Sequence, residues 1–237
     1  MDDRMRDKSD KSMVRDEKIA DNVREIISFL GDNPEREGLL DSPQRIIKSW
    51  QHLFRGYQQD PQAIFKTFEE DDVIPYNQII LLKDIDFYST CEHHFLPFFG
   101  RAHVAYIPAE KVVGISKLAR LLEIFARRLQ IQERIGNQVT AALMDYLEPK
   151  GAACIIESKH FCMTCRGVEK AGAVMEPVFE RIERGIEGET GQADMDDAVF
   201  AGVAEAFGEM QGRIHLDPTG LCNGRWRTQE LPTSGIL

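Results

Sequence analysis

Between two predicted strands the chain reads Ser89-Thr90-Cys91-Glu92-His93-His94-Phe95-Leu96-Pro97-Phe98-Phe99-Gly100. The flanking segments, residues 78–88 and 98–107, are rich in β-branched and aromatic residues, which is typical of β-strands. The loop between them carries a thiol at Cys91 and an imidazole at His94, and a turn can bring both side chains to one point. This stretch therefore predicts two adjacent strands with a candidate metal site at their connection.

The segments that follow extend this pair into a larger fold. Apolar residues recur at helical spacing over residues 118–129 and again over residues 135–147. Residues 152–158 are then predicted to form a strand, and residues 174–182 a weaker one. The order strand–strand–helix–helix–strand–strand predicts an α+β domain with a mostly antiparallel sheet and helices on one face.

The chain is predicted to contain four regions. Residues 1–15 are polar and are expected to form a disordered tail. Residues 16–70 are expected to form an N-terminal helical region, in which two helices pair. Residues 71–210 would form the catalytic domain, which ends in a helical pattern, and residues 211–237 a loose C-terminal tail rich in Gly, Pro and Thr.

The composition is that of an ordinary globular protein. Of 237 residues, 43% are hydrophobic and 29% are charged, and no apolar run is long enough to span a membrane. A net charge of −10 argues against a nucleic-acid partner, because a phosphate backbone attracts a basic surface. The five cysteines are odd in number and the first residues carry no signal-peptide pattern, so we expect reduced thiols and a cytoplasmic location.

A further thiol comes from a second segment, which reads His160-Phe161-Cys162-Met163-Thr164-Cys165-Arg166-Gly167. Cys162 together with Cys91 and His94 would give Zn²⁺ three ligands and leave its fourth position open, as in a catalytic rather than a structural zinc site. On an extended backbone, residues two apart face the same side, so His160 is expected beside the metal as a proton carrier.

Two neighbouring side chains leave alternatives open. Cys165 could complete a closed, four-ligand structural zinc site with the other three residues. If the strand continues past Cys162, however, Cys165 points to the opposite face, which favours a packed core thiol. His93 is adjacent to a ligand, and adjacent side chains diverge, so it is interpreted as an acid or base in the pocket.

Several residues outside these two segments are candidates for binding a small phosphorylated substrate. Ser116 and Lys117 open a predicted helix, whose N-terminus suits an anion, and Arg120 lies one turn further on the same side. Each of them alone is more often a solvated surface residue. Glu133 is either an ordinary exposed acid or a carboxylate for the N–H edge of a guanine. The remaining candidate cations are Arg45 and Lys48, together with Arg166 from the second of the two segments.

Taken together, these residues resemble the GTP cyclohydrolase I family. The resemblance covers about residues 18–170 and consists of many separate motifs, which makes it very specific. It weakens after Lys170, where the family usually has a Ser/Thr-rich strand and this chain does not. The motifs are Gly31-Asp32-Asn33-Pro34-Glu35-Arg36-Glu37-Gly38-Leu39, Ser42-Pro43-Gln44-Arg45, Cys91-Glu92-His93-His94, Gly114-Ile115-Ser116-Lys117, Arg127-Arg128-Leu129-Gln130-Ile131-Gln132-Glu133-Arg134, His160-Phe161-Cys162 and Arg166-Gly167-Val168.

The resemblance implies a tunnelling fold, assembled as a toroidal homodecamer with active sites between subunits. It implies that Cys91, His94 and Cys162 bind zinc and that His93 and His160 transfer protons. The implied reaction is zinc-dependent hydrolysis of GTP at C8, with release of formate and rearrangement to 7,8-dihydroneopterin triphosphate, the first step of tetrahydrofolate and pterin biosynthesis. The implied substrate-binding residues are Gln132 and Glu133 for the guanine, and Arg45, Lys48, Ser116, Lys117, Arg120 and Arg166 for the triphosphate and ribose.

Two other interpretations are compatible with the same motifs. The chain could be a non-catalytic tunnelling-fold protein with a closed structural zinc, which the coordination of the metal would reveal. It could also be a purine-pathway relative that uses the same pocket for another reaction, which analysis of the product would reveal.

Overall fold

The computed structural model of this chain describes residues 3–65, 78–175 and 178–182. They belong to one compact unit that runs to Gly185. The predicted last helix of the catalytic domain and the predicted C-terminal tail lie outside the described residues, so the boundary between them stays a prediction. Within the described part, none of the helices combines the length and the apolar character that crossing a membrane requires.

Two helices precede the sheet, α1 (Asp3–Phe29) and α2 (Ser42–Leu53), and they contact each other as the predicted helical pair does. The start of α1 differs from the prediction, because residues 3–15 are helical where the sequence predicted disorder. Arg, Lys and Met are good helix formers, and extending an existing helix is easier than starting one. The polar segment therefore continues the amphipathic helix toward the N-terminus. Two short 3-10 helices, η1 (Arg55–Gln58) and η2 (Gln62–Ile64), follow α2.

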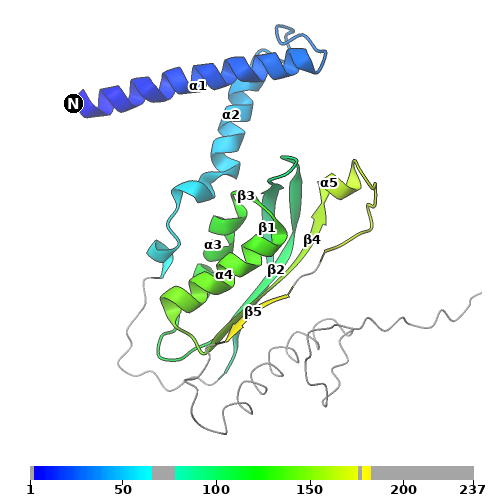
Figure 1. Ribbon diagram of the computed structural model, residues 1–237. Coiled ribbons are helices and arrows are strands. Elements are labelled where there is room, and N and C mark those ends of the chain that lie inside the picture. The colour runs from blue at the N-terminus through cyan, green and yellow to red at the C-terminus, as the bar shows by residue number, and fades with distance from the viewer. Residues whose placement is uncertain (1–2, 66–77, 176–177, 183–237) are drawn as a thin grey trace, which may run out of the picture. The chain divides into compact units, whose positions relative to one another are not determined.

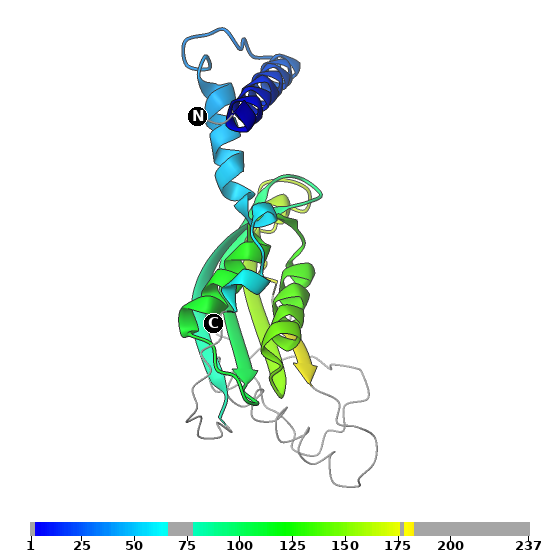
Figure 2. The same ribbon diagram turned by 90° about the vertical axis from the view of Figure 1, so that its left-hand side faces the viewer.

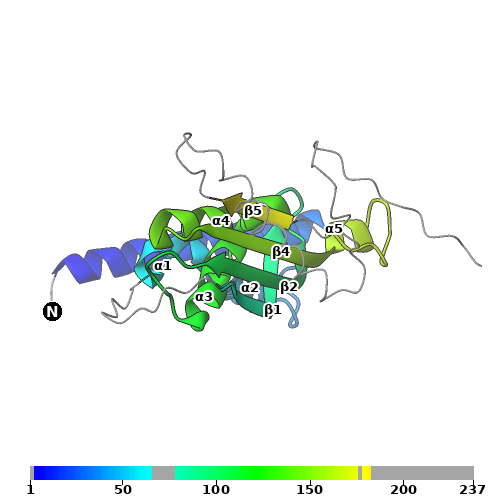
Figure 3. The same ribbon diagram turned by 90° about the horizontal axis from the view of Figure 1, so that it is seen from below.

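Among the described residues, the sheet has five strands in the order β3-β1-β2-β4-β5. All neighbours are antiparallel except the two-residue β3, which runs parallel to the end of β1. Figure 3 shows β5, β4, β2 and β1 side by side in that order. The strands are β1 (Ile80–Cys91), β2 (Pro97–Ile107), β3 (Leu129–Gln130), β4 (Gly151–His160) and β5 (Val178–Ile182).

One face of this sheet is covered by α3 (Ile115–Ala126) and α4 (Gln132–Leu147). Figures 1 and 2 show the two helices on the same side of the strands. Leu122 of α3 and Leu143 of α4 are buried in one core with Phe87 of β1. Burial of a side chain of this size contributes about 1.5–3 kcal/mol to stability. The prediction of an α+β fold with a mostly antiparallel sheet and helices on one face is confirmed.

The strand register gathers distant parts of the chain at one end of the sheet. Thr90 lies opposite Pro97 across the β1–β2 turn, and Phe98 lies opposite His160, the last residue of β4. The parallel pairing of β1 with β3 brings the start of α4 to the same end. A single helical turn, α5 (Phe161–Thr164), follows β4 here, and Figure 1 shows it at the same end as the β1–β2 turn.

Candidate metal centre

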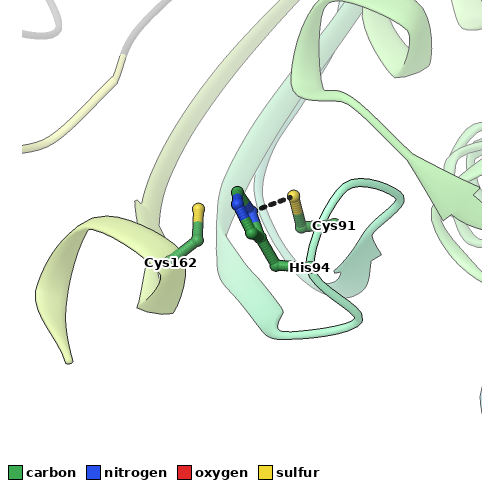
Figure 4. A group of neighbouring side chains, drawn as sticks. All are labelled: Cys91, His94 and Cys162. Atoms are coloured by element: carbon green, nitrogen blue, oxygen red, sulfur yellow. Dashed lines mark hydrogen bonds between the residues drawn. The ribbon is translucent and has the colours of Figure 1, made fainter. Parts of the chain in front are cut away.

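Three side chains at this end of the sheet could hold one metal ion. The sulfur atoms of Cys91 and Cys162 and a ring nitrogen of His94 all lie within 4.8 Å of one another. The Cys91 sulfur lies 3.7 Å from Nδ1 of His94. Figure 4 shows the three side chains gathered at one place, two of them from the β1–β2 turn and Cys162 from α5. We call these three residues the Cys-His-Cys group.

A tight turn brings Cys91 and His94 together. Cys91 is the last residue of β1, and its backbone N–H donates to the carbonyl oxygen of Leu96 at 2.8 Å. The N–H of Phe95 donates back to the carbonyl oxygen of Cys91 at 2.9 Å, and Phe95 itself has a left-handed backbone with φ 55°. The prediction that this loop turns both side chains toward one point is confirmed.

Cys162 reaches the same point in a way that differs from the prediction. The backbone is not extended from His160 to Cys162, because β4 ends at His160 and Cys162 lies in α5. After His160, hydrogen bonds within the helical turn replace those between strands. The backbone N–H of Cys165 donates to the carbonyl oxygen of Phe161 at 3.0 Å, and the Thr164 hydroxyl donates to the carbonyl oxygen of His160 at 3.0 Å. A helix advances about 1.5 Å per residue and a strand about 3.3 Å, so Cys162 stays at the end of the sheet.

Cys165 does not join the Cys-His-Cys group. Its side chain is exposed, and its thiol donates to the carbonyl oxygen of Phe161 at 3.0 Å. The interpretation of Cys165 as a packed core thiol is therefore wrong, because the strand on which it depended ends before Cys162. The geometry of the described residues favours a three-ligand site over a closed four-ligand one.

The donor atoms of the group suit zinc. Two sulfurs and one imidazole nitrogen are typical zinc ligands, and a set of three leaves a coordination position for water or substrate. Burial raises the pKa of the Cys162 thiol, the nearby Cys91 thiol adds to that shift, and the charge of Arg166 opposes it. A bound cation favours the thiolate forms strongly, so metal binding and deprotonation would occur together. The residues that are present fit a zinc ion.

The imidazole of His160 lies next to the group without belonging to it. Its ring stacks on Phe98, with the ring centroids 4.6 Å apart and the planes 5° from parallel. Its Nε2 lies 2.7 Å from Oε1 of Gln132 and 3.0 Å from Oγ of Ser158. Burial lowers the pKa of His160, and the carboxylate of Glu133 opposes that shift. The ring is thus held in one place by stacking and by hydrogen bonds.

The two residues predicted to hold a guanine differ in their surroundings. Gln132 is only 1% exposed, and its amide nitrogen donates to the carbonyl oxygens of Ile156 at 2.7 Å and Met175 at 3.0 Å. Glu133 is exposed, and its charge acts on His160. Of this pair, Glu133 has the side chain that is open to a ligand.

His93 is exposed beside the group. Its Nδ1 lies 4.0 Å from the sulfur of Cys91, and its Nε2 lies 3.8 Å from Oε1 of Glu92. The His93 and His94 rings meet edge to face with centroids 6.1 Å apart, so the two side chains diverge as adjacent residues are expected to do. A substrate at the metal could reach the His93 ring.

The candidate phosphate-binding residues of α3 lie far from the group within one chain. Ser116, Lys117 and Arg120 are in the first turns of α3, and Val113, just before this helix, donates its N–H to the hydroxyl of Tyr106 at 3.0 Å. Tyr106 is near the end of β2 that is remote from the β1–β2 turn. The 11 residues of β2 span roughly 30 Å. A single chain therefore does not bring these residues to the metal centre.

The other candidate cations have different environments. Arg45 lies on an exposed part of α2 and pairs with Asp41 at 3.0 Å, and Lys48 is exposed one turn further along. Arg166 follows α5, and its charge acts on the Cys162 thiol. Within the described residues, Arg166 is thus close to the Cys-His-Cys group.

Three residues at the site had no predicted role. Phe98 stacks on His160, Ser158 contacts the same imidazole, and Arg134 forms an ion pair with Glu92. A signal existed for Ser158, because it ends the predicted strand 152–158 two residues before His160, and residues two apart on an extended backbone face the same side. The pairing of Arg134 with Glu92 joins residues 42 positions apart and has no local signal.

Comparison with known proteins gives a consistent result. A family model described as GTP cyclohydrolase I matches residues 19–182. GTP cyclohydrolase 1 of Wolinella succinogenes is 54% identical over 164 residues, which cover 68% of this chain and 87% of that protein. GTP cyclohydrolase 1 of Chlorobaculum tepidum is 50% identical over 171 residues, covering 70% and 75%. GTP cyclohydrolase 1 of Parabacteroides distasonis is 45% identical over 172 residues, covering 72% and 86%.

Proposed function

The chain belongs to the GTP cyclohydrolase I family, and on that basis we propose that the Cys-His-Cys group is the zinc site of its catalytic centre. The protein is a GTP cyclohydrolase, and therefore a hydrolase. One observation carries the proposal for the metal: three ligand atoms of the types that zinc prefers, from two distant segments, lie within 4.8 Å of one another.

The proposed reaction opens the imidazole ring of GTP at C8, releases that carbon as formate and ends in 7,8-dihydroneopterin triphosphate. Zinc at the three ligands would supply Lewis-acid activation of the attacking water. His160 would carry the proton to and from the imidazole nitrogen of the purine, and its stacking on Phe98 supports this role by keeping the ring in place. His93, exposed beside the group, would donate a proton to the ribose ring oxygen.

Glu133 is proposed to bind the guanine. Its exposed carboxylate can accept hydrogen bonds from the N–H edge of the base, and its effect on the pKa of His160 supports a location next to the proton carrier. Arg166 would contact the phosphates or the ribose from the same side, since its charge acts on Cys162.

A complete site is proposed to require a second copy of the chain. The N-terminus of α3, with Ser116, Lys117 and Arg120, suits a triphosphate, but it is roughly 30 Å from the metal centre of its own chain. A partner subunit that presents this helix end to the Cys-His-Cys group would supply the phosphate site. This distance supports a homo-oligomer, and the decamer is proposed from the family resemblance alone. Arg45 and Lys48 would add to the phosphate site from α2.

The cellular role is proposed from the reaction. A dihydropterin triphosphate is the starting compound of tetrahydrofolate and pterin biosynthesis, and a cytoplasmic enzyme would have access to GTP. Neither a nucleic acid nor a membrane is proposed as a partner, in keeping with the net charge of −10.

The proposal is tested by incubating the full-length, zinc-loaded protein with GTP and assaying formate and the pterin product together. Equal amounts of both are expected, and Cys162→Ala should abolish both while Cys154→Ala, which removes a buried thiol outside the group, should preserve both. Formate without pterin would indicate a relative that catalyses another reaction. Full zinc with neither product would indicate a non-catalytic protein.

A further inference from the structure

The hydrogen bonds of Gln132 fix the orientation of its side-chain amide. Its Nε2 is in contact with two carbonyl oxygens, those of Ile156 at 2.7 Å and Met175 at 3.0 Å. Carbonyl oxygens only accept hydrogen bonds, so the NH₂ group must face them. Oε1 then faces Ser158 and His160. The choice between amide nitrogen and oxygen thus follows from the partners on both sides.

This orientation determines which nitrogen of His160 carries a hydrogen. Oε1 of Gln132 can only accept, and Nε2 of His160 lies 2.7 Å from it, so Nε2 must be the N–H nitrogen. The hydrogen bonds of Ser158 are consistent with this assignment. Its hydroxyl donates to the same Oε1 at 2.5 Å and keeps a lone pair for Nε2–H of His160 at 3.0 Å. In the neutral imidazole, Nδ1 is then the bare nitrogen.

Two further sets of contacts hold the His160 ring and the Gln132 amide in these orientations. Phe98, fully buried, stacks on the His160 ring and fixes its plane. Met175 pairs with Ser158 through both backbone hydrogen bonds, at 3.0 and 3.1 Å, so one acceptor of the Gln132 amide is itself anchored to β4. A flipped His160 ring would place a carbon at Oε1 and lose its hydrogen bonds.

We propose that Gln132 is a positioning residue, which holds His160 with Nε2–H bound to the protein and leaves Nδ1 as the nitrogen that exchanges a proton with the substrate. Gln132 then makes no contact with guanine, because both amide hydrogens and the amide oxygen already have partners inside the protein. Recognition of the base is left to Glu133. The function of Nδ1 rests on the proposed reaction, whereas the tautomer of His160 does not.

The tautomer can be read without any assay of activity. In neutral histidine the protonated and bare ring nitrogens differ widely in ¹⁵N chemical shift. Solid-state NMR of the full-length, zinc-loaded protein with labelled histidine would show the His160 signals, identified by their loss in His160→Ser. We expect a protonated Nε2 and a bare Nδ1. A protonated Nδ1 with a bare Nε2 in the wild-type protein would overturn the proposal.

Kinetics separate positioning from substrate binding. Gln132→Met keeps the length of the side chain and removes all its hydrogen bonds, so kcat should fall by roughly 10–100-fold, as is usual for a lost supporting partner. The KM for GTP should stay within about threefold, because no ground-state contact is removed. The double variant Gln132→Met/His160→Ser should be no slower than His160→Ser alone, since both changes act on one group. A raised KM at normal kcat, with a further loss in the double variant, would instead make Gln132 a guanine contact.

Gln138 provides the matched control. It lies on the same helix, is partly buried and accepts a hydrogen bond from Gln130 at 2.7 Å. Gln138→Met should therefore carry a similar structural cost and leave kcat near the wild-type value. If Gln132→Met does not fold, the NMR measurement on the wild-type protein still decides the tautomer. If the wild-type protein does not convert GTP, the proposed reaction is wrong. The same spectrum still tests whether Gln132 holds His160 in the tautomer with a protonated Nε2.

Discussion

Arg134 on the first turn of α4 forms a two-point ion pair with the carboxylate of Glu92, in the turn that carries Cys91 and His94. Its Nη2 donates to Oε1 at 3.0 Å, and its Nη1 donates to Oε2. The hydrogen bonds from Arg134 lower the pKa of Glu92, which is thus a carboxylate. Two parallel N–H···O bonds fix the relative orientation of both groups. The pair therefore ties the turn that carries Cys91 and His94 to the helix that carries Glu133.

Arg134→Met is expected to weaken zinc binding without removing a ligand. Loss of the pair frees the turn from α4, and changes in such supporting contacts typically reduce metal affinity by about 10–100-fold. Arg134→Lys keeps the charge but not the planar fork, so its affinity should be intermediate. Competition with a chromophoric chelator measures the affinity. The control is Arg101→Met, which breaks the exposed pair with Asp84 and should leave the affinity unchanged. Equal affinities for all variants would contradict a supporting function of Arg134.

Cys165→Ala should retain one zinc per chain, whereas Cys162→Ala should lose it. The Cys162 sulfur belongs to the Cys-His-Cys group, whereas the Cys165 thiol donates a hydrogen bond to the carbonyl oxygen of Phe161. Zinc content is measured on purified protein by elemental analysis, together with GTP turnover. Loss of zinc from Cys165→Ala would favour the closed, four-ligand site.

The sequence predicted the main elements of the fold because their periodicity is strong. The helices α3 and α4 and the strands β1, β2 and β4 are each ten or more residues long, so their sequence patterns extend over many residues. β3 has only two residues, so no alternation could reveal it. The helical start of α1 was not predicted, because a charged segment without an apolar face resembles a disordered one in sequence.

The metal centre shows what spacing can and cannot predict. Cys91 and His94 are close in sequence, and a turn alone brings them together. Cys162 lies beside Cys91 and His94, as the spacing predicted. Its local structure was not predicted, because one helical turn depends on contacts at the end of β4 rather than on a repeating pattern. The environment of Gln132 depends on Ile156 and Met175, which are distant in sequence and approach it only through the sheet.

The free thiols should differ strongly in reactivity. Cys154 is fully buried, and burial raises its pKa to about 12, so almost no thiolate forms near pH 8. Cys165 is exposed. With zinc bound, alkylation by iodoacetamide followed by peptide mass spectrometry should label Cys165 and leave Cys154 unmodified until denaturant is added. Labelling of Cys154 in the native protein at the rate of Cys165 would contradict the burial of this strand.

Gly100→Ala should destabilise the protein and reduce activity. A Cβ at Gly100 would overlap the carbonyl oxygen of Glu157 and lie 2.8 Å from Cα of Ser158, so β2 and β4 would have to move apart close to His160. Overpacking of this kind costs about 1–3 kcal/mol. Thermal unfolding at fixed protein concentration measures the effect. Gly172→Ala is the control, because among the described residues no heavy atom other than those of its chain neighbours lies within 4 Å of its added Cβ. Equal midpoints for the two variants would contradict the close strand contact.

His160→Ser should separate metal binding from chemistry. His160 does not belong to the Cys-His-Cys group and is only partly buried, so the variant should keep its zinc and its fold. Pterin formation should fall by at least about 10²-fold, the usual effect of losing a general acid or base.

The same variant should show where the reaction stops. In the proposed reaction, attack at C8 depends on the Cys-His-Cys group, which the substitution leaves in place. A ring-opened formamide species should therefore accumulate while formate release stalls. The measurements are zinc content, formate and pterin, with liquid chromatography to detect the opened intermediate. His52→Ser, which changes an exposed histidine on α2, is the matched control and should behave as the wild type. Loss of zinc from His160→Ser, or pterin formation near the wild-type rate, would remove His160 from the position of proton carrier.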